Sequence, residues 1–256
     1  MNYTKLRFLL SIDTPDWNQL LLNLSSLNIT FPAAHSPNTG YSCPPEDFVK
    51  LIVATKNLKC LSLKGLINAN HISILDFLYC CNKLEELILD KCSVHFPHPD
   101  GININFEPHK ILKKLHIKNK NSPFLSSKYM TLSIARLIPN LEELVFRPEP
   151  SYTGFTLDTI KTLSLMPKLE KLEVSVSTED SVNNMPSFVY VLREFPSLRF
   201  LTLSWGASPP EIHQGRTHRM VDWLENVLQA DNANIYVQIC HELHSNIYNN
   251  SPLLNG

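Results

Sequence analysis

One short pattern, Leu-x-x-Leu-x-apolar, returns through most of this 256-residue chain. The leucines that open it are 34, 26, 28, 29, 28 and 29 residues apart in turn, and they are Leu24, Leu58, Leu84, Leu112, Leu141, Leu169 and Leu198. A nearly constant period of this size is typical of proteins built from a row of similar structural units. The pattern therefore predicts seven such units.

The end of each unit alternates between apolar and variable residues, as in Leu87-Ile88-Leu89 and Leu172-Glu173-Val174. Alternation with a period of two is typical of a short strand that buries one face. Each unit is therefore predicted to contribute one strand.

The segments between these strands change to helical spacing of their apolar residues. The residues concerned are Leu51 and Ile52; Ile74, Leu75 and Leu78; Leu157, Ile160 and Leu163; and Phe188, Val191, Leu192 and Phe195. A strand followed by a returning helix, repeated, stacks parallel strands with a right-handed crossover. We therefore expect an α/β solenoid with a curved parallel sheet and with helices on its convex side.

Proline stands two residues before the opening leucine in three consecutive units, at Pro139, Pro167 and Pro196. Proline cannot continue a helix, and it favours an extended conformation in the residue before it. We expect these prolines to end each helix at one fixed point.

The units LEELILDKC, LKKLHIKNK, PNLEELVF, PKLEKLEV and PSLRFLTL resemble the leucine-rich repeats of the ribonuclease-inhibitor-like type found in F-box and leucine-rich-repeat proteins. The resemblance covers residues 24–206 and implies a protein-binding module, the substrate-recognising part of an SCF-type ubiquitin ligase receptor. Cys92 occupies the Asn/Cys position of the repeat, where its side chain would bond backbone groups after the strand. Other residues occupy this position in the remaining units: Pro32, Leu66, Lys120, Glu149, Ser177 and Gly206.

No F-box pattern is present in residues 1–23, where residues 6–12 instead suggest a degenerate strand. We therefore expect either a fragment or a family member without its adaptor-binding segment, so that a Skp1-type adaptor would bind only if an F-box lies upstream. The expected domain is a single repeat domain over residues 1–244. It would end in a cap at 219–240, formed by a helix from Met220 to Leu228 and a strand from Ile235 to Ile239, before a disordered tail at 245–256. Residues 32–45 should form a surface loop, and residues 96–108 should be extended or 3₁₀.

Composition excludes several classes of protein. Basic and acidic residues number 23 and 24, so no bulk positive charge favours nucleic acid. No apolar run reaches the roughly 18 to 20 residues that span a bilayer, and no secretory segment opens the chain. The six cysteines form no CxxC pair and are expected to be free thiols, with Cys80 and Cys81 buried. We expect a soluble protein of the cytoplasm or nucleus.

The side chains between the buried leucines should stand on the concave face of the sheet, which is the default binding surface of a solenoid. The candidate partner-binding residues are Glu86, Ile88, Asp90, Lys114, His116, Lys118, Glu143, Val145, Arg147, Lys171, Glu173, Phe200 and Thr202. Phe200 and Trp205 could anchor a protein partner, although Trp205 could equally be buried against the cap. Acidic Glu86 and Asp90 stand beside the basic residues of the next strand, Lys114, His116 and Lys118. In the alternative interpretation, these acidic and basic residues only pair with each other and keep the sheet soluble.

Nothing in the sequence points to catalysis or to a cofactor. The GxSxG, GxGxxG and Walker sequences are absent. Two clusters of histidines match no HExxH pattern: His95, His98 and His109, and His241 and His244. The leading hypothesis is therefore a protein-interaction module, with a repeat scaffold unrelated to ubiquitin as the alternative. A metal-dependent enzyme that uses the histidine clusters is a more distant alternative.

Overall fold

The computed structural model describes residues 15–31, 45–66, 72–102, 106–118, 128–147, 155–176, 185–205, 226–227 and 235–241. Strands and helices alternate along this part of the chain. The strands are β1 (Ser26–Thr30), β2 (Cys60–Lys64), β3 (Glu86–Asp90), β4 (Lys114–Lys118), β5 (Glu143–Arg147), β6 (Lys171–Val176), β7 (Phe200–Trp205) and β8 (Tyr236–His241). The helices are α2 (Pro15–Leu22), α3 (Pro45–Ala54), α4 (Ile74–Cys80), α5 (Lys128–Leu137), α6 (Leu157–Leu163) and α8 (Met185–Arg193), and the 3₁₀ helix η1 spans Pro99–Gly101.

The strands form one open, wholly parallel sheet in which the spatial order is the chain order, from β1 to β8. Equivalent positions of successive units pair directly, as in Leu27 with Leu61 and Leu61 with Leu87. The long first interval between units does not shift this register. Extra residues are therefore accommodated outside the strands.

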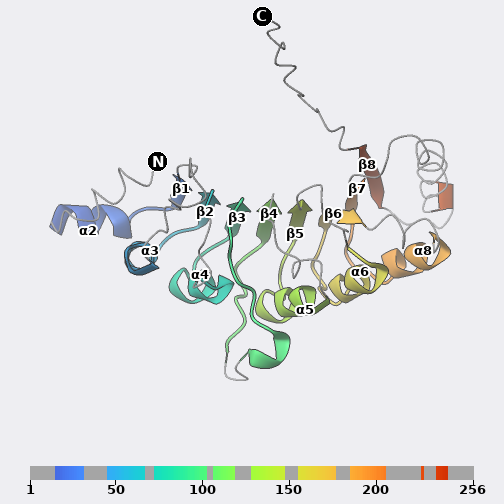
Figure 1. Ribbon diagram of the computed structural model, residues 1–256, viewed down its shortest axis with the longest axis horizontal. Coiled ribbons are helices and arrows are strands. Elements are labelled where there is room, and N and C mark those ends of the chain that lie inside the picture. Colours follow the sequence, from blue (N-terminus) through green and yellow to red (C-terminus); the bar gives the residue numbers. More distant parts are fainter. Residues whose placement is uncertain are drawn as a thin grey trace, which may run out of the picture.

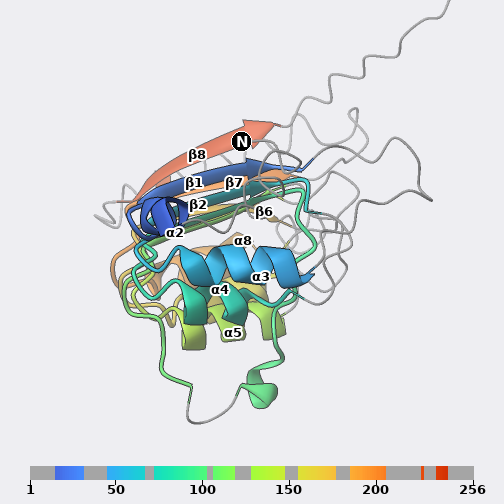
Figure 2. The ribbon, with the colours of Figure 1, turned by 90° about the vertical axis from the view of Figure 1, so that its left-hand side faces the viewer.

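Helices α3, α4, α5, α6 and α8 lie on one side of the sheet, as Figures 1 and 2 show from two directions, and α2 lies near the edge formed by β1. In Figure 1 the strands and helices form two shallow arcs, with the strands on the inner side. We call the side of the sheet that faces away from these helices the concave face. The arrangement is α/β and compatible with a solenoid.

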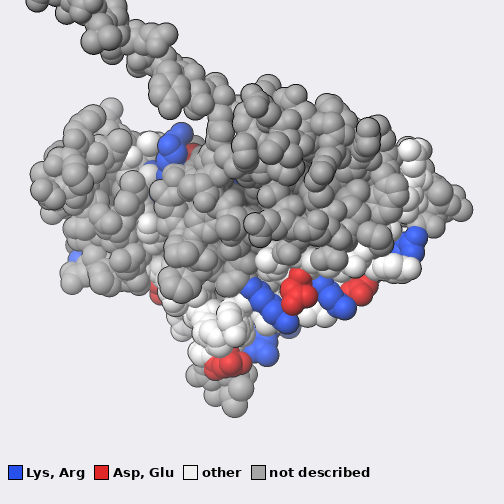
Figure 3. Space-filling view, turned by 45° about the vertical axis from the view of Figure 1, so that its right-hand side comes forward, with Lys and Arg blue, Asp and Glu red and all other residues white. Residues whose placement is uncertain are grey.

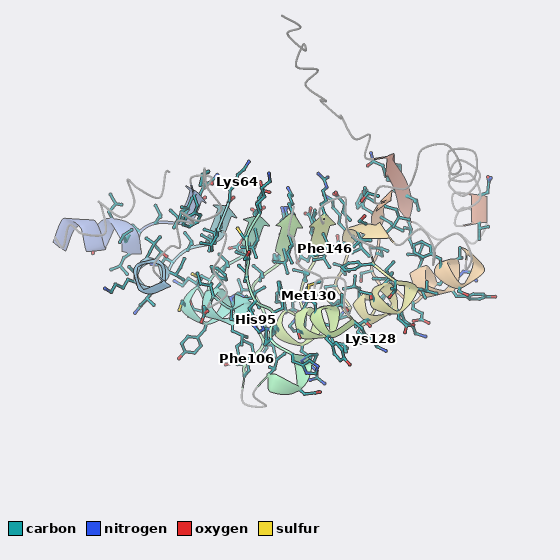
Figure 4. All side chains as sticks on the ribbon, in the orientation of Figure 1. Lys64, His95, Phe106, Lys128, Met130 and Phe146 are labelled. Atoms are coloured by element: carbon teal, nitrogen blue, oxygen red, sulfur yellow. The ribbon has the colours of Figure 1, made fainter. Side chains whose placement is uncertain are left out.

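The core lies between the sheet and the helices. Alternate strand residues point into it and are fully buried, among them Leu87, Leu115 and Leu172. Phe146 of β5 and Met130 of α5 both lie in this layer, whereas Lys64 of β2 points away from the helices (Figure 4). The period-two alternation of each strand is therefore the alternation between core and concave face.

Helix α4 begins at a capping box. The Ser73 hydroxyl accepts a hydrogen bond from the Leu75 N–H (3.2 Å), and the Asp76 carboxylate accepts one from the Ser73 N–H (2.7 Å). These two bonds satisfy N–H groups that the first helical turn leaves without partners.

A tight turn precedes the opening leucine of most units. The leucine N–H donates to the carbonyl three residues earlier: Leu58 to Thr55 (3.0 Å), Leu84 to Cys81 (3.0 Å), Leu141 to Ile138 (3.2 Å) and Leu169 to Met166 (3.4 Å). Pro139 and Pro167 occupy the second position of this turn, where a fixed φ is favoured. Helices α5, α6 and α8 end at Leu137, Leu163 and Arg193, at different distances before the prolines. The prediction of one fixed helix end was therefore wrong, because the prolines shape the turn and do not set the last helical residue.

Most of the predicted elements are confirmed. The seven strands, the helices at α3, α4, α6 and α8, the 3₁₀ turn after Phe96 and the last strand, which begins at Tyr236, are all present. Phe195 lies just beyond α8, and neither α2 nor α5 was predicted. The segments 6–12, 32–44 and 245–256 lie outside the described residues, as does most of 220–228.

Candidate interaction face

The register of the sheet arranges the concave face in three rows that run across the strands. The first row is Ser26, Cys60, Glu86, Lys114, Glu143, Lys171, Phe200 and Tyr236; the middle row is Asn28, Ser62, Ile88, His116, Val145, Glu173, Thr202 and Gln238; the third begins Thr30, Lys64, Asp90, Lys118 and Arg147. Every candidate residue chosen from the sequence has its place in these rows. The sequence pattern thus predicted correctly which residues share one face.

Charged residues in these rows pair across neighbouring strands. Lys171 donates to Glu143 (2.7 Å), and Lys64 lies 3.4 Å from Asp90. Arg147 donates to Glu173. Much of the charge is therefore satisfied between neighbouring strands, which is the kind of pairing that the alternative interpretation expected, with Asp90 paired to Lys64 of β2.

Glu143 contacts both Lys171 and His116 on neighbouring strands. Its Oε1 accepts from Lys171 and also lies 3.2 Å from Nε2 of His116. Burial acts to raise the pKa of Glu143, but the hydrogen bond and charge of Lys171, together with His116, outweigh it and hold the pKa below its ordinary value. The carboxylate is therefore held ionised against its burial.

His116 lies beside Glu143 in the middle of the face. Burial lowers its pKa despite the opposing effect of Glu143. If Nε2 donates to Glu143, Nδ1 becomes an acceptor, and this buried atom has no hydrogen-bond partner among the described residues. The neutral ring therefore shares the middle row with apolar Ile88 and Val145.

Two candidate residues are less accessible than the sequence suggested. Val145 and Glu173 hold the predicted register but are buried, with exposed fractions of 3% and 8%. Alternation with a period of two predicts the face on which a side chain lies. It does not predict how much of that side chain is covered by its neighbours. Both residues are better placed to support their neighbours than to contact a partner first.

An aromatic pair occupies the C-terminal end of the first row. Phe200 and Tyr236 are both exposed, and their rings meet edge to face with centroids 6.4 Å apart. Sequence reasoning selected Phe200 but missed Tyr236; the phase of Val237, which pairs with Leu201 and is buried, was the signal that would have found it. The side chain of Trp205 lies outside the part that the structure describes.

The opposite, helical side has a different character. Acidic and basic residues alternate along the lower border of the molecule in Figure 3. On the helical side, Lys161 of α6 pairs with Glu194, just beyond α8, at 3.5 Å. Exposed tyrosines stand on separate helices, at Tyr79, Tyr129 and Tyr190.

Two of the histidines considered as metal ligands, His98 and His109, pack against other parts of the fold. His109 is buried in a turn, and the ring of His98 lies against that of Tyr129 at 4.6 Å. Among the described residues, no three His, Cys, Asp or Glu side chains are grouped so that they could hold a metal ion. His244 lies outside the described residues.

The cysteines that the structure describes are free thiols, as predicted: Cys60, Cys80, Cys81 and Cys92. Cys81 is buried and Cys80 half-buried. Cys92 donates to the carbonyls of Leu63 and Asp90, both at 3.3 Å, which confirms its predicted contact with the backbone at the end of the strand.

No protein-family model matches the sequence, and a search of curated proteins also gave no match. Within the described ranges, no helix has the length and apolar character needed to cross a bilayer. The concave face, with its three rows of side chains, is the candidate interaction surface of this chain.

Proposed function

We propose that this chain is a protein-interaction module of the leucine-rich-repeat type and that it binds its partner on the concave face. The observation that carries the proposal is the register of the sheet, which aligns the variable residues of successive units into continuous rows. Rows of this kind offer an extended surface on a rigid support, which is how stacked-repeat proteins bind. The exposed aromatic pair adds the type of residue that dominates binding energy at interfaces.

The assignment to the ribonuclease-inhibitor-like repeat type is supported by three features. The strands follow one another in chain order, helices return between most of them, and Cys92 bonds backbone carbonyls at the consensus position. Gly65 and Lys91 occupy equivalent places after β2 and β3 and share positive φ angles of 77° and 53°. These two units are therefore alike in their turns as well as in their strands.

The experiment compares partners captured from cell extract by the tagged full chain and by two variants. Lys114→Glu combined with Lys118→Glu changes the concave face, while Lys161→Glu is the control on the helical side. We expect the first variant to lose proteins that the wild type and the control retain, with all three chains showing the same melting transition. An unchanged set of partners, or an equal loss in the control, would exclude the concave face as the binding surface.

The narrower proposal, substrate recognition for an SCF-type ubiquitin ligase, rests on the resemblance of the repeats. Its test is direct binding of purified Skp1-type adaptor to this chain and to any longer transcript. Binding by the longer transcript supports the ligase assignment. Failure of both to bind leaves a repeat scaffold unrelated to ubiquitin.

A further inference from the structure

The cations of the concave face are more exposed than the anions with which they pair. The exposed fractions of the side chains are 57% for Lys64 against 21% for Asp90, 49% for Arg147 against 10% for Glu173, and 43% for Lys171 against 16% for Glu143. In all three pairs the carboxylate lies close to the sheet and the basic group reaches outward.

This difference is specific to the face and does not follow from cations having longer side chains. Immediately before the strands, Lys59 pairs with Glu85 and Lys113 with Glu142, with exposed fractions of 57% and 43%, and of 52% and 41%. The two members of each of these pairs are exposed to a similar degree. On the concave face, in contrast, a partner meets the positive groups first, including the exposed Lys114.

From these observations we infer that the partner is an extended acidic protein segment, which carries carboxylate side chains and an apolar side chain nearby. The inference rests on the proposed function and specifies the chemistry of its partner. The paired carboxylates, Asp90, Glu143 and Glu173, keep the net charge of the face small, so a long phosphate backbone would gain little from binding there. Separate carboxylates can instead meet the basic groups one at a time.

The spacing of side chains in the first row predicts the spacing of acidic and apolar residues in the partner. Neighbouring strands are about 4.8 Å apart, so the midpoint between Phe200 and Tyr236 lies about 7 Å from Lys171 along the row. Alternate side chains of an extended peptide are also about 7 Å apart. A carboxylate on Lys171 would therefore place the side chain two residues away between the two aromatic rings. A second carboxylate, two residues to the other side, would lie between the positions of Glu143 and Lys114, because Lys114 is about 9.6 Å from Lys171 along the row. The long, exposed side chain of Lys114 can reach across the remaining distance of about 3 Å.

The test uses the full chain and a random peptide library, followed by affinity measurements on defined peptides. We expect enrichment of Asp or Glu two residues from an aromatic or large aliphatic residue. A labelled peptide containing Glu-Ser-Glu-Ser-Phe should bind, and its counterpart with Lys in place of both Glu should not. Lys114→Gln and Lys171→Gln should each raise the Kd by about tenfold, which equals about 1.4 kcal/mol. Phe200→Ala should do the same without any change of charge.

The matched control is Lys113→Gln, because Lys113 precedes Lys114 directly and pairs with Glu142 outside the three rows. It should leave the Kd unchanged, and melting curves of all variants establish that they fold. Enrichment of basic peptides, equal weakening in the control, tighter binding of a single-stranded RNA probe, or no peptide binding at all would each overturn the inference. If partners from cell extract still depend on the concave face but bind through uncharged or basic segments, the proposed function stands and only the acidic partner is excluded.

Discussion

His109 Nδ1 accepts a hydrogen bond from the backbone N–H of Leu112 at 3.1 Å, while its Nε2 lies 3.1 Å from the carbonyl of Cys81. In other units a backbone carbonyl accepts the hydrogen bond from the opening leucine, as the Ile138 carbonyl does from the Leu141 N–H. The imidazole thus bridges two neighbouring repeats. Both contacts require the neutral ring, with Nδ1 as acceptor and Nε2 as donor.

The first prediction concerns pH. Burial lowers the pKa of His109, and that of His116, below the ordinary value of 6.5. The unfolded chain therefore takes up protons on these residues before the folded chain does, and the free energy of unfolding falls as the pH drops below about 6.5. Met166 stands three residues before its opening leucine, as His109 does before Leu112. His109→Met should therefore fit this position and should reduce the dependence of the free energy of unfolding on pH. Urea unfolding between about pH 7 and pH 5 measures it.

The control for this experiment is His95→Gln, because His95 is exposed. It should leave the pH dependence unchanged. A slope in the His109→Met protein as steep as in the wild type would show that other groups cause the loss of stability.

A second prediction concerns the turn after the strands. Gly65 has a φ of 77°, and a Cβ at this position would lie 3.1 Å from the Phe31 carbonyl oxygen. Gly65→Ala should lower the free energy of unfolding by about 1–2 kcal/mol. Lys91 adopts a φ of 53° at the equivalent place, so Lys91→Gly should be neutral or stabilising by up to about 1 kcal/mol. Chemical denaturation measures the change in the free energy of unfolding for each variant. Destabilisation by Gly65→Ala without destabilisation by Lys91→Gly supports the shared turn, whereas equal destabilisation by both changes would contradict it.

A third prediction concerns the core between the sheet and the helices. The rings of Phe146 and Phe155 are stacked with centroids 4.6 Å apart, and both side chains are buried. Phe146→Ala should cost about 3–5 kcal/mol because it leaves a cavity. The double variant with Phe155→Ala should cost less than the sum of the single changes, by about 0.5–1.5 kcal/mol. Strict additivity would show that the two rings do not stabilise each other, and Tyr190→Ala on an exposed helix surface is the control.

A fourth prediction concerns thiol reactivity. Burial raises the pKa of Cys81 to about 12 and that of Cys92 to about 11. The thiolate is the reactive form, so iodoacetamide should label both far more slowly than the half-buried Cys60 at mildly alkaline pH. Peptide mass spectrometry reads each site separately, and the denatured chain is the control in which all sites should react. Rapid labelling of Cys92 in the native protein would contradict its placement under the turn.

The repeating leucines were sufficient to predict the first seven strands and the residues that share a face, because alternation with a period of two fixes the face of each side chain and the equivalent leucines align successive strands. The same pattern could not predict that Val145 and Glu173 are buried, since cover depends on neighbouring side chains and not on phase. Helix α5 was missed because its buried side includes polar Thr131 and Ser133.

The role of His109 was also missed, and for a different reason. Its unit has no described α-helix before the strand, so the residue resembled a loop histidine with metal-binding potential. Alignment of position 109 with Thr55, Cys81, Ile138 and Met166, each three residues before an opening leucine, is the signal that identifies it as a turn residue.

The unchanged register across unequal intervals has a consequence for how this chain could diversify. Between β1 and β2 the opening leucines are 34 residues apart and between β2 and β3 only 26, yet the strands align residue for residue. Insertions and deletions between the strands can therefore accumulate without disturbing the order or spacing of the side chains on the concave face. Loop length and binding specificity are thus free to evolve independently.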